Sequence, residues 1–260
     1  EHLYTCNDLR KKSLDVFRGF IVQKIEKWIE HNLGTEMLPD ANTSNRKYYN
    51  MSIYYFKYSG VARILPMGHN LQMNNIYFGA DKLAHFLSTG MRYFNVYKKY
   101  IRKGYSEKDA FRKAIDFGIR LERTVLGYWP SGVFSFGDLE ANYQGLLFYR
   151  NLCEGSNPYL IRDGNMWKVK NEVDLRDYIG PYWDETFNLS HFNFFKWFKV
   201  KRNLKNYCKI KDSELVVKRM SYYKSVAQES FSVKYLNDLR TKKDKRIPHP
   251  EKRSLDTVCP

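Results

Sequence analysis

The segment SGVFSFGDLEANYQGLLFYRNL, residues 131–152, places polar side chains that could do chemistry inside an apolar and aromatic stretch. Its central polar residues are Asp138, Glu140, Asn142 and Gln144. A carboxyl group in an apolar environment can act as a general acid or base, because its surroundings shift its pKa towards neutrality. These side chains therefore either stabilise the start of a helix or line a catalytic site.

Glu122 is the strongest candidate for a general acid. It continues an apolar stripe that includes Ile115 and Gly118 at helical spacing, so its carboxyl group should point into the core. Burial raises the pKa of a carboxyl group, and glycosidic cleavage requires a carboxylic acid that is protonated near neutral pH. The structural alternative is a glutamate at a helix end that reaches water or pairs with Arg120 or Arg123.

Ser135 and Asp138 have the spacing of a helix capping box, which accounts for Asp138 without any catalytic role. Asn142 lies one turn later on the same face of an apolar helix, where a buried amide must be hydrogen-bonded. Gly145 extends this face and permits the close approach of another element. We therefore expect Asp138, Asn142 and Gly145 to form one surface, with Glu140 as a further acidic group beside it.

Two other polar groups stand out along the chain. In DKLAHF, Asp81 and His85 are four residues apart and thus on one side of a helix, with Lys82 beside them. A metal site there would need one further acid, and the HExxH or multi-histidine spacing is absent, so we predict no metal and no other cofactor. In YWDETF, Asp184 and Glu185 form an acidic pair between aromatic residues, a composition that is equally typical of a core.

Helical periodicity must position these residues. The segments with apolar residues at three- and four-residue spacing are 13–34, 81–101, the stretch after Ser106, and 135 to about 153. The last of them is apolar nearly all round and should be central. Glycine and proline in residues 127–137 exclude a long helix there and predict an irregular hairpin, and a second short hairpin is expected around Asp163–Gly164.

The pattern predicts a mainly α fold with a small β-hairpin, in the α+β class. We expect residues 1–160 to form a helical core that carries the candidate site. Residues 161–260 should form a basic, aromatic-rich region packed on that core. With 260 residues, of which 43% are hydrophobic, the chain is long enough to bury a substantial core. No apolar run reaches 18 residues, so a transmembrane helix is not expected.

The positive charge is concentrated near the C-terminus. Residues 196–253 contain 18 lysines and arginines against 6 acidic residues, which supplies +12 of the formal net charge of +16. Such a segment favours binding to a polyanion, and nucleic acid, anionic lipid and acidic cell-wall polymers all qualify. The structural alternative is a solvated basic face.

The four cysteines are Cys6, Cys153, Cys208 and Cys259. None forms a CxxC pair, which argues against a zinc or thioredoxin-type site. The chain begins without methionine, so we expect a mature, exported form from which a leader has been removed. Disulfides are then expected, although the sequence leaves their pairing open, and four free thiols in a cytosolic protein are the alternative.

The polar groups together resemble the pattern DKxxHF…E…SxxDLxAN, which VanZ-like proteins and small YfiM-like envelope lipoproteins share. The matching positions are Asp81, Lys82, His85, Glu122, Ser135, Asp138, Asn142 and Gly145. The resemblance implies one shared polar site and names no reaction. The chain departs from VanZ-like proteins because it lacks their membrane helices and adds a long basic part.

A helix that ends in Glu122, then a glycine-rich hairpin and a buried helix, is similar to the lysozyme superfamily. The whole chain also resembles secreted lysozymes of Bdellovibrio-type predatory bacteria. The resemblance implies a lysozyme-like core with a basic C-terminal extension and a catalytic acid at Glu122. Ser131, Ser135 or Asp138 would face that acid across the sugar. Supporting roles would then fall to Asp81, Lys82, His85, Asn142 and Glu140.

We therefore expect a secreted or periplasmic, monomeric muramidase that cleaves glycosidic bonds of peptidoglycan glycan strands. The Lys/Arg-rich residues 196–253 would adhere to an acidic polymer surface. Because Glu122, Asp138 and Glu140 make the site acidic, a locally cationic, N-deacetylated wall should be preferred. The first alternative is a non-catalytic protein that binds the cell envelope. The second is a nucleic-acid binder, which we do not expect because no helix-turn-helix, zinc-finger or RRM motif occurs.

Overall fold

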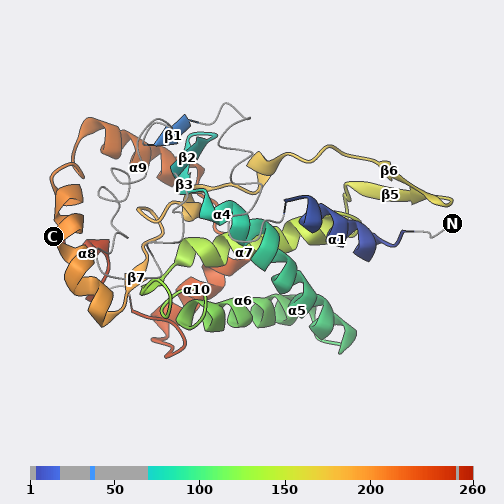
Figure 1. Cartoon of the computed structure of the whole chain (residues 1–260), viewed down its shortest axis with the longest axis horizontal. Helices are drawn as coiled ribbons and strands as arrows, with labels where there is room; N and C mark the ends of the chain where they lie inside the picture. Colours follow the sequence, from blue (N-terminus) through green and yellow to red (C-terminus); the bar gives the residue numbers. More distant parts are fainter. Residues whose placement is uncertain (1–3, 18–35, 39–69, 250–251, 260) are drawn as a thin grey trace.

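The computed structural model describes residues 4–17, 36–38, 70–249 and 252–259. The described part is mostly helical with small antiparallel sheets, which confirms the mainly α, α+β class (Figure 1). The helix predicted at 13–34 overlaps the described residues only at its start, in α1 (Cys6–Phe17). No helix among these residues is long and apolar enough to span a membrane.

Three packed helices form the centre of the molecule (Figure 1). They are α5 (Gly90–Arg102), α6 (Glu107–Arg123) and α7 (Phe136–Asn151). Only the serine half of each predicted capping box is present: the Ser106 hydroxyl accepts from the Asp109 amide and the Ser135 hydroxyl from the Asp138 amide. The Ser135 amide donates to Glu122 and not to the Asp138 carboxylate, so the capping box does not account for the Asp138 side chain. Helix α7 is buried over nearly its whole length, as its apolar sequence predicts.

The entry to α5 is a π-helical segment. The short helix α4 (Asp81–Ala84) continues into a π-helix at His85–Thr89 before α5 begins. A Cβ atom on Gly145 of α7 would lie only 1.9 Å from the Phe86 carbonyl oxygen, so no other residue fits there without a shift. The close approach predicted for Gly145 is therefore confirmed. Such π-helical insertions often occur at functional sites.

The strands form three small antiparallel sheets. They are β1 (Glu36–Leu38), β2 (Asn70–Met73) and β3 (Ile76–Gly79) in one sheet, β4 (Val133–Phe134) with β7 (His191–Phe192), and β5 (Leu160–Asp163) with β6 (Met166–Val169). The β5–β6 hairpin confirms the turn predicted at Asp163–Gly164. The hairpin predicted at residues 127–137 is wrong. The loop after α6 forms consecutive turns instead, and its strand β4 pairs with β7 from a distant part of the chain.

The second half of the chain contributes to the same core. Its helices are α8 (Phe194–Cys208), α9 (Glu214–Val226) and α10 (Phe231–Thr241), with short 3-10 turns at Leu175–Asp177, Pro181–Trp183 and Leu255–Thr257. Helix α10 packs against α6 and α7, and the Arg240 guanidinium lies 3.8 Å above the Phe136 ring. Trp183 is fully buried, with its ring edge-on to Phe78. The turn that contains Trp183 packs against α7, and a Cβ on Gly137 near the start of α7 would lie 3.1 Å from the Trp183 carbonyl oxygen.

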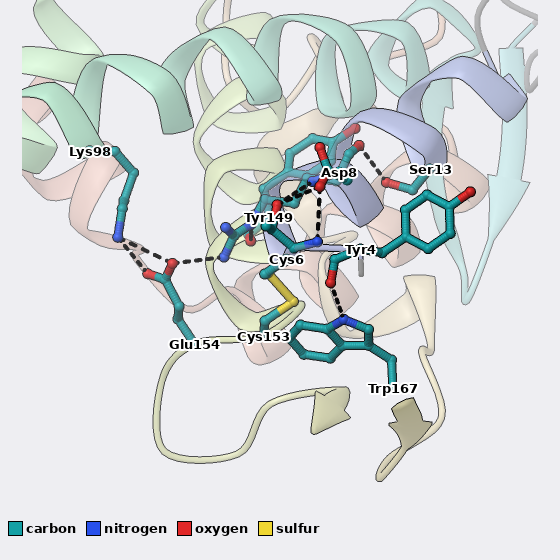
Figure 2. Close-up of a disulfide and its surroundings, with 11 residues drawn as sticks. Tyr4, Cys6, Asp8, Ser13, Lys98, Tyr149, Cys153, Glu154 and Trp167 are labelled. Atoms are coloured by element: carbon teal, nitrogen blue, oxygen red, sulfur yellow. Dashed lines mark hydrogen bonds and ion pairs between the residues drawn. A yellow bond between two sulfur atoms is a disulfide. The ribbon is translucent and has the colours of Figure 1, made fainter. Parts of the chain in front are cut away.

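Two disulfides, Cys6–Cys153 and Cys208–Cys259, confirm the expected oxidation of the cysteines and decide the pairing. Figure 2 shows the first of them. Beside the first, the Arg10 guanidinium donates to the Tyr149 carbonyl oxygen (2.7 Å). This contact and the disulfide fasten α1 to the end of α7.

Removing either disulfide is expected to destabilise the protein, and the first should matter more. The double substitution Cys6→Ser with Cys153→Ser opens a loop with a sequence separation of 147 residues, against 51 for Cys208→Ser with Cys259→Ser. Chain entropy predicts losses of about 4 kcal/mol of unfolding free energy for the shorter loop and about 5 kcal/mol for the longer one. Urea unfolding of the two double variants measures the difference. Equal losses would show that native-state contacts, and not loop length, set the cost.

Candidate functional site

A buried ammonium group lies at the centre of the polar site. Lys82 Nζ is 2.6 Å from Asp138 Oδ1, 2.8 Å from Glu185 Oε1 and 3.1 Å from Asp81 Oδ2, and its side chain is only 3% exposed. Burial lowers the pKa of Lys82, but Asp138 and Asp81 more than offset this, so the pKa is raised. Lys82 is therefore a permanent cation that joins α4, α7 and the segment after Trp183.

Ser135, at the N-terminus of α7, is hydrogen-bonded to the carboxyl groups of both Glu122 and Glu185. Its hydroxyl donates to Glu185 Oε1 (2.8 Å) and accepts from the Asp138 amide (3.1 Å), while its own amide donates to Glu122 Oε2 (3.3 Å). Glu185 was visible in the sequence only as part of the acidic pair in YWDETF. Burial raises the pKa of Glu185 to about 7.

His85 is held between Asp138 and Asn142. Its Nε2 lies 3.2 Å from Asp138 Oδ2, and its Nδ1 lies 3.1 Å from Asn142 Oδ1. Since the Asn142 Nδ2 donates to the Tyr93 hydroxyl (3.5 Å), its Oδ1 faces the ring and His85 Nδ1 is the donor. The Tyr93 hydroxyl can occupy this position because residue 118 is glycine. A Cβ atom on Gly118 would overlap the hydroxyl. The amide of Asn142 is thus hydrogen-bonded, as its burial requires.

Asp138 is an ionised carboxylate within this network. Burial by itself would raise its pKa, but the charges of His85 and Lys82, together with the hydrogen bond from Lys82, hold the pKa below its usual range. Both oxygens of Asp138 face a nitrogen of a basic side chain. The carboxylate therefore stays charged at neutral pH.

Glu122 is in the opposite electrostatic state. It is 1% exposed, and its Oε1 has no hydrogen-bond partner among the described residues. Burial, reinforced by the negative charge of Asp138, raises its pKa well above the ordinary value for glutamate. No ion pair joins it to a described arginine, and Arg123 instead donates to the Lys245 carbonyl oxygen (2.6 Å). The surroundings therefore favour the protonated form of Glu122 and the anionic form of Asp138.

Glu140 lies outside this network. It is two residues after Asp138 and so points to another side of α7, where Gln144 Nε2 donates to Oε1 (2.7 Å) and the Ser230 hydroxyl to Oε2 (2.7 Å). It lines a cavity of about 510 Å³ with Tyr143 and Tyr182. The sequence predicted one site that includes Glu140. The structure instead has two separate polar clusters, the network around Lys82 and Asp138 and the group formed by Glu140, Gln144 and Ser230. Ser131 is also apart, since its hydroxyl donates to a carbonyl in its own loop.

The unfolding free energy is expected to fall as the pH rises from about 5 to 7, with Glu140 as one cause. Burial raises its pKa to about 7 in the folded protein, so the folded state keeps a proton that the unfolded state releases earlier. Linkage then predicts a loss of at most about 3 kcal/mol from this group. Glu140→Gln should flatten the pH profile of urea unfolding between pH 5 and 7. An unchanged slope would mean that Glu140 does not titrate in this range.

Three side chains of the network are of the types that bind metal ions. Asp81, His85 and Asp138 each offer a ligand atom within 4.8 Å of the others. However, the ammonium of Lys82 already supplies positive charge to both aspartates and would repel a dication. The arrangement is therefore better suited to organising carboxylates than to holding a metal.

The structure brings together seven of the eight catalytic and supporting residues predicted from the sequence and adds Glu185. The seven are Asp81, Lys82, His85, Glu122, Ser135, Asp138 and Asn142.

Comparisons of the chain with models of protein families, with curated proteins and with solved structures find no significant match. The chemistry of the site is therefore inferred from its own geometry.

Proposed function

We propose that this protein is a secreted or periplasmic, lysozyme-like glycoside hydrolase that cleaves peptidoglycan, with Glu122 as its general acid. The observation that carries the proposal is the contrast between two neighbouring carboxyl groups. The pKa of Glu122 is raised and that of Asp138 is lowered. Paired carboxyl groups whose pKa values are pushed apart in this way are the acid and the anion of glycoside hydrolysis.

In the proposed reaction, Glu122 donates its proton to the glycosidic oxygen as the bond from that oxygen to the anomeric carbon breaks. The leaving sugar thus departs with a hydroxyl group. Water adds its hydroxyl to the anomeric carbon to form the new reducing end, and its remaining proton returns to the Glu122 carboxylate. Because its pKa is low, Asp138 is a weak base and is better suited to stabilising the oxocarbenium-like transition state than to deprotonating water. A water held by Ser135 could serve the opposite face of the sugar.

The remaining network residues would position Asp138. His85 and Lys82 each hold one of its oxygens, and Asn142 fixes the orientation of the His85 ring. Since Glu122 is buried, the proposal requires that the loop after α6 moves when a glycan binds. Trp129 in that loop is 74% exposed and offers an aromatic face to a sugar ring.

The basic C-terminal region supports binding to an acidic wall. On α8, the exposed side chains Phe194, Phe198, Lys201 and Lys205 follow one another at three- and four-residue spacing and so share one face. This face would contact an acidic polymer surface of the wall. The two disulfides are compatible with such a compartment. We further propose that the protein acts as a monomer, without nucleic acid.

The experiment that tests the proposal is the release of soluble, labelled fragments from purified peptidoglycan, with new reducing ends counted in parallel. Matched walls with and without N-acetyl groups should both be digested. The deacetylated wall should be digested faster if the Asp138 carboxylate favours a cationic sugar. Equal rates on the two walls would contradict the preference for deacetylated wall but would still support hydrolysis. No new reducing ends on either wall would contradict the enzymatic proposal.

A second candidate, a non-catalytic protein that binds the envelope, is favoured by one observation. Glu122 and Lys82 are almost completely buried, as expected for a hydrogen-bond network that only stabilises the fold. This candidate predicts sedimentation of the protein with peptidoglycan in the absence of any release. Wall binding without hydrolysis would select it.

A further inference from the structure

A second polar cavity, of about 320 Å³, lies beyond the C-terminal end of α6. Its charged and polar walls are Arg123, Tyr128, His191, His249, Lys252 and Arg253. These residues come from the end of α6, the loop that follows it, strand β7 and the segment near the C-terminus. The function proposed above gives no catalytic or sugar-binding role to these six side chains.

The charge of this cavity is unbalanced. Arg123, Lys252 and Arg253 are cationic at neutral pH, and no acidic residue of the described chain lines the cavity with them. None of the three forms an ion pair with a described residue, and the buried Nε of Arg253 has no acceptor among them. Three like charges around one hollow repel one another, and an anion between them would relieve that repulsion.

The two histidines add hydrogen-bonding groups. His191 is buried and its Nδ1 lies 2.7 Å from the Tyr128 hydroxyl. Burial lowers the pKa of His191 to about 4, and the positive charges of Arg253 and His249 contribute to this effect. His191 is therefore neutral at neutral pH and senses the positive potential of the cavity.

We propose that this cavity is a binding site for the carboxylate or phosphate group of a small anionic ligand. The guanidinium forks of Arg123 and Arg253 suit the planar or tetrahedral oxygens of such groups. Arg123 and Lys252 are exposed at the cavity, so a ligand can reach it from solvent. A volume of about 320 Å³ is within the range of small-molecule sites. The proposal does not depend on the glycosidase function, because it concerns other residues and binding alone.

The test uses calorimetry and NMR at low ionic strength with inorganic phosphate, N-acetylmuramic acid and the neutral sugar N-acetylglucosamine. Both anions are expected to bind and to shift the ring signals of His191 and His249, while those of His85 in the separate network stay in place. Binding of phosphate alone would identify a phosphate site, and binding of the muramic acid alone a site for a glycan carboxylate. The neutral sugar should not shift these signals.

Arg253→Gln is expected to weaken anion binding by about tenfold or more, the effect of losing a charge-assisted hydrogen bond. The matched control is Arg162→Gln, because Arg162 is exposed on the β5–β6 hairpin and, among the described residues, its side chain bonds only the Gly164 carbonyl oxygen. If Arg253→Gln does not fold, the exposed Lys252→Gln replaces it. Failure of both anions to shift the His191 signals, or equal affinity in parent and variant, would overturn the proposal.

Discussion

Glu122→Gln is expected to lower glycan release from peptidoglycan by about 10²- to 10⁴-fold, the usual contribution of a general acid. The amide is close in shape to the acid and can still accept the hydrogen bond from the Ser135 amide, but it has no acidic proton to give to the leaving oxygen. Burial and the charge of Asp138 raise the pKa of Glu122 and favour its neutral form, so the neutral glutamine is a close electrostatic substitute. Thermal melting should therefore show a folded variant.

The matched control for this variant is Glu107→Gln. Glu107 starts the same helix and is exposed, so the identical substitution there should leave release unchanged. If Glu122→Gln releases glycan as fast as the parent, Glu122 is not the general acid. Absence of release by the parent as well, with wall binding intact, would favour the non-catalytic envelope protein.

Lys82→Met is expected to destabilise the protein by about 3–5 kcal/mol, the cost of leaving buried charges without their partner. Methionine can fill the space of the lysine stem but cannot compensate Asp138, Asp81 and Glu185, which all lie within 3.1 Å of the ammonium. Urea unfolding at neutral pH measures the loss. Lys242→Met is the control, because its exposed pair with Asp238 should contribute no more than about 0.5 kcal/mol.

The pH dependence of this variant gives an independent check. The pKa of Asp138 is lowered in the folded protein, so its ionisation contributes stability that is present above the unfolded pKa and lost as the pH falls. The difference in unfolding free energy between the parent and Lys82→Met should therefore become smaller as the pH is lowered. A gap that stays constant with pH would show that lost packing, and not lost charge, destabilises the variant.

The sequence by itself determined the features that depend on neighbours along the chain. Ser106 and Ser135 cap their helices as predicted, because a cap bonds an amide three residues away. The apolar stripe ending at Glu122 predicted its burial, and the spacing of Asp138 and Asn142 predicted their common face. The sequence also indicated that Glu140 points elsewhere, because residues two apart, such as Asp138 and Glu140, lie on different faces of a helix.

Only the tertiary structure decided which distant segments meet. Glu185 reaches Lys82 because the segment around Trp183 docks on the α7 N-terminus, and β4 pairs with β7 instead of closing its own hairpin. The disulfide partners and the cationic cavity near Arg253 arise in the same way. Helical periodicity and capping are set by residues within one turn, whereas these contacts depend on which apolar surfaces bury one another when the whole chain packs.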